Sequence, residues 1–304
     1  MKFVDTVFNE RFYRKEGRSM KNILQLKDVS KTFPNTSFKL NNISFSIPYG
    51  SIVGFIGENG AGKTTTMGTI LGTLKKDSGT IYIFGQTIDQ KNKDIKENIG
   101  VVFDQMNFSG NLNVAQLSNV FQNIYRQWDS DTFFHYINHF SLPIKDKIQG
   151  FSRGMSMKLS IAVALSHDAK LLILDEATAG LDPVAREEVL EVLLEFVKDK
   201  KRSILLSSHI TSDIEKIADE LIFIKKGEII LKVSKDELLN NYSMITCTPH
   251  QLKHINHKQI IAYKHQKDGV EVLLSRKRDL PPLFNQKDFS IDDIALLLMK
   301  GDKQ

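Results

Sequence analysis

The chain has one cysteine in 304 residues, Cys247, so no disulfide can form within it. A single thiol is typical of a protein kept in a reducing compartment such as the cytoplasm. The sequence also lacks an apolar run approaching the roughly 18 residues that a membrane-spanning helix needs. If the protein works at a membrane, we therefore expect another chain to supply the membrane spans.

Residues 1–20 lack the apolar core of a secretory signal and match nothing that follows. We expect a flexible N-terminal extension that follows from an upstream start codon, with Met20 as the true start. An amphipathic arm that binds a membrane surface is the other interpretation.

No sign of charge dominates the composition. Lys and Arg number 41 against 36 Asp and Glu, a formal net charge of +5, and the excess is spread along the chain. This argues only weakly for an anionic partner such as a lipid surface or nucleic acid. The length permits a large core and more than one folding unit.

The glycine-rich stretch GENGAGKTT at 57–65 is the strongest local motif. Gly57, Gly62, Lys63 and Thr64 satisfy the pattern G-x-x-x-x-G-K-[ST]. Small residues let backbone N–H groups close around phosphate oxygens, the lysine reaches the β- and γ-phosphates, and the hydroxyl binds Mg²⁺. The motif predicts a nucleotide phosphate site.

The flanking residues support this interpretation. SIVGFI (51–56) is typical of a buried parallel strand, and residues 64–74 have the apolar spacing of a helix. The loop therefore lies at a helix N-terminus, where the helix dipole and free N–H groups favour anions.

A second motif, KLLILDEATAGLD, covers residues 170–182. Its apolar residues predict a central strand with Asp175 and Glu176 at the carboxyl end, where open α/β sheets bind ligands. Asp175 suits an indirect hold on Mg²⁺, and Glu176 is a candidate general base for water. Two adjacent carboxylates at a buried strand end are costly without a partner.

Two further strands end in polar residues. IGVVFDQ (99–105) ends in Asp104 and Gln105, and RSILLSSHI (202–210) ends in Ser208 and His209. His209 is suited to bond a terminal phosphate, although a histidine in isolation is more often structural.

Phe33 follows a predicted strand just upstream of the phosphate loop. It either stacks on a nucleotide base or packs on the core, and its position alone does not decide between the two.

The remaining pattern predicts strands alternating with helices, with a charged, solvated segment at 89–98. Strands are expected at 23–33, 38–47, 78–88, 244–249, 259–265 and 270–275, with a hairpin at 218–234. Helices are expected at 114–127, 130–140, 151–169, 184–199 and 289–301.

Taken in order, these parts resemble the ATPase subunit of ATP-binding cassette (ABC) transporters over residues 22–240. GENGAGKTT matches the Walker A loop and LLILDE the Walker B strand with its catalytic glutamate. AGLD (179–182) looks like the D-loop, FSRGM (151–155) stands where the signature LSGGQ belongs, and His209 matches the switch histidine.

The resemblance implies an α/β fold, a P-loop NTPase core with a mostly parallel central sheet. An antiparallel β subdomain, an inserted helical subdomain and a small C-terminal α+β extension would accompany it. We expect an N-terminal extension at 1–20, an ATPase domain at 22–237 with its helical subdomain at about 106–165, and a C-terminal domain at 238–304.

The resemblance also assigns residues to the site. Those implied for binding ATP are Phe33, Gly57, Asn59, Gly60, Ala61, Gly62, Lys63, Thr64, Thr65, Ser152, Gly154 and Asp182. Those implied for Mg²⁺ are Thr64, Asp175 and Asp104, and those implied for catalysis are Glu176, His209 and Asp104.

Two departures from the family pattern affect these assignments. The signature segment carries Arg153 and Met155, and the family's Q-loop glutamine falls on Asp104, with Gln105 one place later. Both departures resemble a bacterial subgroup of bacitracin-type and phenol-soluble-modulin-type peptide exporters. We expect Asp104 to take the metal-sensing role and Gln105 to face a membrane partner, unless a one-residue slip returns Gln105 to the metal.

The resemblance implies Mg-ATP hydrolysis in an ATP-sandwich dimer with a second, identical or related ATPase subunit. An integral membrane subunit would bind the dimer at the inner face of the cell membrane and export amphipathic peptides, lipids or drugs, as in antimicrobial peptide resistance. No nucleic acid partner is expected.

Two alternatives remain at this point. One is a soluble ABC ATPase acting on ribosomes or DNA, against which stand the single cassette and the lack of a long heptad insertion. The other is an ATP-binding module without turnover, which the intact Lys63, Asp175, Glu176 and His209 argue against.

Overall fold

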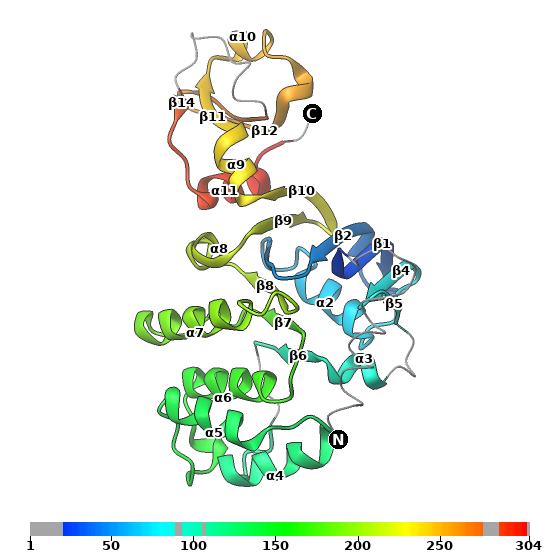
Figure 1. The fold of residues 1–304 in the computed structure, drawn as a ribbon. Coiled ribbons are helices and arrows are strands. Elements are labelled where there is room, and N and C mark those ends of the chain that lie inside the picture. Colours follow the sequence, from blue (N-terminus) through cyan, green and yellow to red (C-terminus); the bar gives the residue numbers. More distant parts are fainter. Residues whose placement is uncertain (1–20, 89–92, 105–107, 276–285, 303–304) are drawn as a thin grey trace.

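The computed structural model describes residues 21–88, 93–104, 108–275 and 286–302. The predicted extension at 1–20 and Gln105 lie outside the described residues. The described chain forms three sheets with helices packed around them (Figure 1).

The central sheet has six strands in the order β10-β9-β3-β8-β7-β6. Its pairs are parallel from β6 to β9, and only the β9–β10 hairpin is antiparallel. This confirms the predicted mostly parallel sheet. Its strands are β3 (Ile52–Ile56), β6 (Ile99–Val102), β7 (Leu171–Asp175), β8 (Ser203–Ser208), β9 (Glu220–Lys225) and β10 (Glu228–Ser234).

The strands β3, β7 and β8 are buried along their whole length. Apolar side chains on both faces explain why their sequences read as continuous hydrophobic runs rather than as alternating ones. Because these three strands also run parallel, their carboxyl ends meet at one edge of the sheet, where the polar residues that follow them come together.

An antiparallel sheet in the order β2-β1-β4-β5 lies beside the central sheet (Figure 1). Its apolar residues share a core cluster with β3 and with helix α2, which includes Phe45, Phe55 and Met67. The elements are β1 (Asn22–Thr32), β2 (Lys39–Pro48), β4 (Ser78–Ile83), β5 (Gln86–Thr87) and α2 (Lys63–Leu71).

The helical part lies next to β6, at the opposite end of the molecule from the C-terminal sheet (Figure 1). It comprises α4 (Val114–Ile124), α5 (Ser130–His139), η1 (Ile148–Gly150) and α6 (Arg153–Leu165). Asn113 and Gln116 form a capping box at the start of α4, which satisfies backbone donors that the helix cannot. Helix α6 is apolar and buried along its second half and packs against β6.

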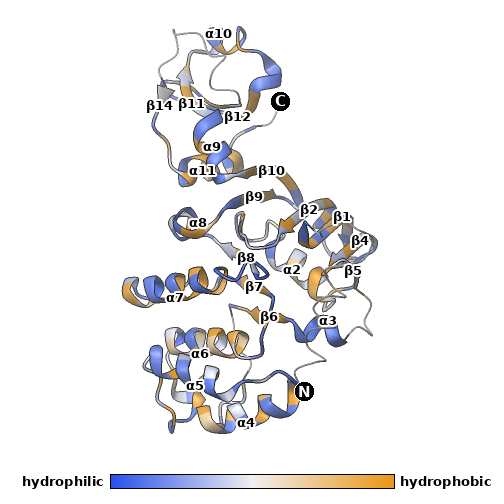
Figure 2. Cartoon of the chain, in the orientation of Figure 1, coloured by the Kyte–Doolittle hydropathy of each residue, from blue (hydrophilic) through white to orange (hydrophobic). Residues whose placement is uncertain are grey.

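Two helices follow β7 and β8 and pack on the sheet, α7 (Pro183–Phe196) and α8 (Thr211–Ile217). In Figure 2, α7 carries both hydrophobic and hydrophilic residues, and its buried side includes Val189, Leu190 and Leu193. Such a stripe is what holds an amphipathic helix to a sheet.

The C-terminal part contains an antiparallel sheet in the order β12-β13-β11-β14, whose core holds Cys247. Cys247 is buried, and this burial raises the pKa of its thiol. The elements are α9 (Lys235–Asn241), β11 (Tyr242–Cys247), α10 (Pro249–Leu252), η2 (His257–Gln259), β12 (Ile260–Gln266), β13 (Gly269–Ser275), β14 (Gln286–Lys287) and α11 (Ile291–Lys300).

Helix α11 packs between this sheet and the central one, because its buried residues, among them Ile294 and Leu298, belong to the main core cluster. The domain boundary predicted between 237 and 238 stays a prediction.

The structure adds helices that the sequence pattern did not predict, namely α8, α9 and α10. The charged segment expected to be solvated at 89–98 is described from Lys93 on, where it forms a short helix, α3 (Lys93–Glu97), with Lys93, Asp94 and Lys96 exposed and Ile95 buried. None of the described helices is long and apolar enough to cross a membrane.

Candidate functional site

The phosphate loop connects β3 to α2, as the motif predicts. Gly62 caps the helix with a φ of 116°, a conformation that side chains other than glycine rarely adopt. A Cβ added to Gly57 would lie 2.6 Å from the carbonyl oxygen of Ile224, so only glycine fits there. The first N–H groups of α2 have no partner within the helix, and Gly62 has no side chain to supply one. The loop therefore presents free donors suited to an anion.

Lys63 lies inside this loop, with its side chain only 6% exposed. Its Nζ donates to the carbonyl oxygen of Gly57 at 2.7 Å and lies 3.4 Å from Glu176 Oε1. A buried ammonium group needs such oxygen partners, because its desolvation is otherwise costly. The contact joins the phosphate loop to the end of β7.

Asp175 is buried at the carboxyl end of β7 and accepts two hydroxyl hydrogen bonds. Thr64 donates to its Oδ2 at 2.6 Å, and Ser207 donates to its Oδ1 at 2.5 Å. The Thr64 hydroxyl and the Asp175 carboxylate are thus neighbouring oxygen ligands of the kind that Mg²⁺ prefers. The donor set fits a magnesium ion that keeps several waters.

Glu176 follows with a φ of 56°, an unusual backbone conformation for a residue with a side chain. Ser207 holds it there by accepting from its N–H through both the carbonyl oxygen (3.1 Å) and the hydroxyl (3.2 Å). The side chain then points to His209, whose Nδ1 lies 2.5 Å from Oε2. Because an ionised carboxylate only accepts, Nδ1 of His209 carries the proton in this arrangement.

The other carboxylate oxygen of Glu176, Oε1, is buried and has no hydrogen-bond partner, although Lys63 Nζ lies at 3.4 Å. A buried acceptor without a donor is unusual and points to a group that enters the site. A water bound next to Lys63 would supply that donor.

The signature segment lies at the first turn of α6. Ser152 caps this helix by accepting from the N–H of Met155 at 3.2 Å, and a Cβ on Gly154 would lie 3.4 Å from Leu181. The D-loop is therefore the neighbour of the signature segment within this chain. In the described part of the chain, no polar contact joins Ser152 to the phosphate loop.

Arg153 forms an ion pair with Asp104, which follows the end of β6. Its guanidinium also covers Gly180, where an added Cβ would meet Arg153 Cδ at 3.2 Å. In this structure, the cationic partner of Asp104 is therefore Arg153 of the signature segment.

Asp182 caps α7 by accepting from the N–H groups of Val184 and Ala185, both at 3.0 Å. The bond from Ala185 is the main reason that the pKa of this carboxyl is lowered. The structure therefore gives Asp182 a local role in shaping the D-loop.

Phe33 lies just beyond β1 and is half-buried rather than part of the core. Its ring centroid is 6.2 Å from that of Phe38, whose ring edge would meet a Cβ on Gly62 at 3.2 Å. Asp77 holds the end of β1 by accepting from the backbone N–H and hydroxyl of Thr32 at 2.7 and 2.6 Å. Phe33 is thus anchored beside the phosphate loop.

The structure brings Lys63, Thr64, Asp175, Glu176 and His209 together and places Ser152 and Gly154 apart from them. The sequence interpretation missed Ser207, which bonds both carboxylate residues. The two adjacent serines at the end of β8, Ser207 and Ser208, were the available signal. Because side chains alternate along a strand, only one of the two can face the carboxylates, and this one is Ser207.

Comparison with known proteins agrees with this geometry. The family model described as ABC transporter matches residues 40–179. The lantibiotic transport ATP-binding protein SrtF of Streptococcus pyogenes is 35% identical over 72% of this chain and 96% of its own length.

The bacitracin transport ATP-binding protein BcrA of Bacillus licheniformis is 32% identical over 72% of each chain. A solved structure described as the ATP binding subunit of an ABC transporter matches with a TM-score of 0.66 at 27% identity, covering 71% of this chain and 91% of that one.

Proposed function

The chain belongs to the ABC transporter ATPase family, and on that premise we propose that it powers the export of amphipathic peptides through a separate membrane subunit. The relatives named for bacitracin and lantibiotic transport support this cargo class. The proposed chemistry is carried by one observation: Glu176 contacts both the buried Lys63 of the phosphate loop and the exposed His209.

ATP would bind with its phosphates in the phosphate loop and its base near Phe33. Lys63 would exchange its carbonyl partners and Glu176 for phosphate oxygens, which carry more negative charge. Thr64 and Asp175 would hold Mg²⁺, which neutralises charge on the phosphates when bound. Asp104 stays a proposed metal-sensing residue, and it reaches the metal only after it leaves Arg153.

Glu176 is the proposed general base. Its buried Oε1 is free to accept a hydrogen bond from the attacking water, while its Oε2 is held by His209. The proton on Nδ1 and the backbone N–H of His209 orient the carboxylate. This fixes the direction of proton transfer, as general base catalysis requires.

A second ATPase subunit completes the site in this proposal. Gly154 lies beside Leu181 of the D-loop and Ser152 caps its own helix, and neither makes a polar contact with the phosphate loop of its own chain in the described residues. Their hydroxyl and helix N-terminus are therefore available for nucleotide held by another copy. The dimer would sit on the inner face of the cell membrane against the membrane subunit.

The proposal is tested with Glu176→Gln in the purified full-length chain. Glutamine keeps the size of the side chain but is a poor base, so the variant should bind Mg-ATP, stop hydrolysing it and accumulate as an ATP-dependent dimer. Light scattering and a phosphate-release assay measure the two properties. Near-normal hydrolysis would remove Glu176 from the proposed role.

A further inference from the structure

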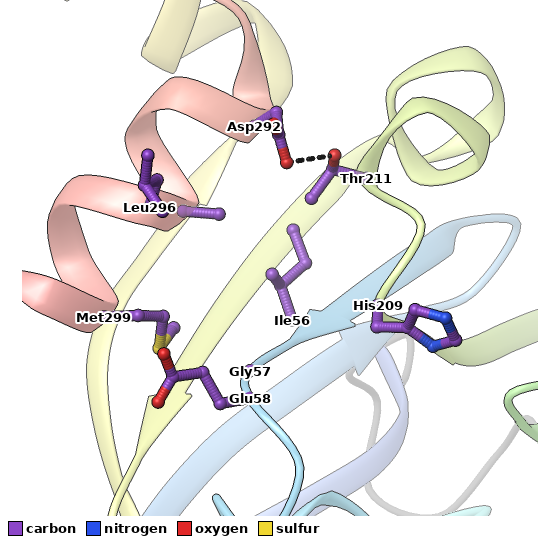
Figure 3. A pocket seen from close by; sticks show the side chains of 9 residues that line it. Ile56, Gly57, Glu58, His209, Thr211, Asp292, Leu296 and Met299 are labelled. Atoms are coloured by element: carbon purple, nitrogen blue, oxygen red, sulfur yellow. Dashed lines mark hydrogen bonds between the residues drawn. The ribbon is translucent and has the colours of Figure 1, made fainter.

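The C-terminal helix α11 is attached to the catalytic core at a point two residues from His209. Thr211, the first residue of α8, donates from its hydroxyl to Asp292 Oδ1 at 2.9 Å. Figure 3 shows the two side chains pointing toward each other, while the ring of His209 points away from α11. A residue of the C-terminal part is thus bonded to the segment that carries the switch histidine.

The segment that carries His209 is a short turn, residues 208–211, and both of its ends are held. Ser208 accepts from the N–H of Ile210 at 2.9 Å and fixes the side next to β8. Ile210, the N-cap of α8, supplies no side-chain hydrogen bond, so Thr211 is the polar anchor on the other side. His209 lies between these two anchors, and its direction depends on both.

On the side that faces the phosphate loop, α11 is not closely packed. A cavity of about 170 Å³ separates α11 from the phosphate loop, with Gly57 and Glu58 on one wall and Leu296 and Met299 on the other (Figure 3). Side chains do not fill this gap, so on this side the contact of α11 with the loop is weak, while Ile294 and Leu298 on its other side hold it in the core.

The opposite end of α11 is held independently. Lys225 at the end of β9 donates to the carbonyl oxygens of Leu298 and Gly301 at 3.2 and 2.9 Å. This bond satisfies terminal carbonyls at the C-terminal end of the helix, whereas Asp292 lies in its first turn. Helix α11 therefore has two polar attachments, and only the one at Asp292 is to the turn that carries His209.

We infer that Asp292 is a positioning residue for ATP hydrolysis: through Thr211 it holds the 208–211 turn so that His209 orients the Glu176 carboxylate. The inference rests on the proposed roles of Glu176 and His209. It gives the C-terminal domain a direct effect on turnover, outside the region that the family model matches.

The test measures kcat and KM for ATP in the full-length chain. Asp292→Ala and Thr211→Val each remove the bond and should lower kcat about tenfold with KM nearly unchanged, as for a misplaced catalytic group. Asp292→Asn keeps an acceptor and Thr211→Ser keeps a donor, so both should restore most of the activity. Lys225→Met loosens the other end of α11 and should leave kcat unchanged.

Two combinations separate this inference from the proposed function. Adding Asp292→Ala to His209→Ala should lower kcat no further if Asp292 acts through His209. Thr211→Val and Asp292→Ala should likewise not add to each other. Thermal unfolding identifies any variant that fails to fold, in which case the Thr211 pair carries the test.

Several results would overturn the inference. They are a normal kcat in Asp292→Ala, an equal loss in Lys225→Met, a failure of Asp292→Asn to restore activity, or a further loss on top of His209→Ala. If instead Glu176→Gln hydrolyses ATP normally, the proposed catalytic role fails, whatever Asp292→Ala does.

Discussion

Arg153 in the signature segment and Asp104 at the end of β6 form an ion pair within one chain. The pair joins the helical part, through the first turn of α6, to the central sheet. A cation in the first turn of a helix opposes the helix dipole, and Asp104 offsets that cost. Both side chains are about half exposed, at 58% and 44%, so the pair is weak enough to exchange partners.

This exchange gives the first prediction. If Asp104 senses the metal, Arg153 competes for it, so Arg153→Ala should lower the Mg²⁺ concentration that half-saturates ATPase activity, and Asp104→Ala should raise it. A Mg²⁺ titration of the full-length subunit measures both. Shifts in the same direction, or none, would contradict the competition.

The second prediction concerns Lys63. Its ammonium group is buried and held by carbonyl oxygens and Glu176, so phosphate oxygens are the natural replacement. Lys63→Ala should weaken ATP binding by at least tenfold, as expected for a lost charged contact of roughly 1.5–3 kcal/mol. Equilibrium binding of a fluorescent ATP analogue measures the loss, and Lys96→Ala, at an exposed lysine of α3, serves as the control.

Phe33 provides the third prediction. Stacking of a base on an aromatic ring contributes roughly 1–3 kcal/mol, so Phe33→Ala should raise the Kd for ATP about tenfold. Phe33→Tyr keeps the ring and should bind normally. Inorganic tripolyphosphate, which has no base, should bind both the native chain and Phe33→Ala equally. A loss of tripolyphosphate binding would show that the phosphate loop itself had changed.

The fourth prediction is a pH dependence of stability from His167. This residue is buried against the ring of Tyr125 at 4.0 Å, and burial lowers the pKa of its imidazole. Below about pH 6.5 the unfolded chain takes up a proton at His167 that the folded chain does not, so the free energy of unfolding falls.

This loss amounts to at most about 1.4 kcal/mol per pH unit. Urea unfolding between pH 7.5 and 5 should show a steeper fall for the native chain than for His167→Gln, which keeps a donor for the carbonyl oxygen of Glu97. Parallel curves for the two proteins would assign the acid sensitivity to other groups.

Much of the site could be predicted from the sequence because its chemistry is local. The phosphate loop needs glycine at fixed positions, and two carboxylates at the end of a buried strand are costly unless a cation or a ligand offsets their charge. The helix at 289–301 was similarly marked by Ser290, whose capping box with Asp293 the structure confirms.

The rest depended on contacts between residues far apart in the chain. The Arg153–Asp104 and Thr211–Asp292 pairs are separated by 49 and 81 positions, and no periodicity marks either. Helix α9 had a local signal, since Ser234 accepts from the N–H of Glu237 three residues on. The apolar alternation of the preceding hairpin, which ran to Ser234, obscured it.

The burial of Cys247 has a practical consequence for measuring motion. Thiol reagents attack the thiolate, and this thiol is both shielded and held protonated by its surroundings. A cysteine introduced on the surface, for example at exposed Val184 beside the D-loop, would therefore accept a spectroscopic label while Cys247 stays unlabelled. Distances between labels on two copies could then follow each ATP-driven cycle without a substitution of Cys247 in the core of the C-terminal sheet.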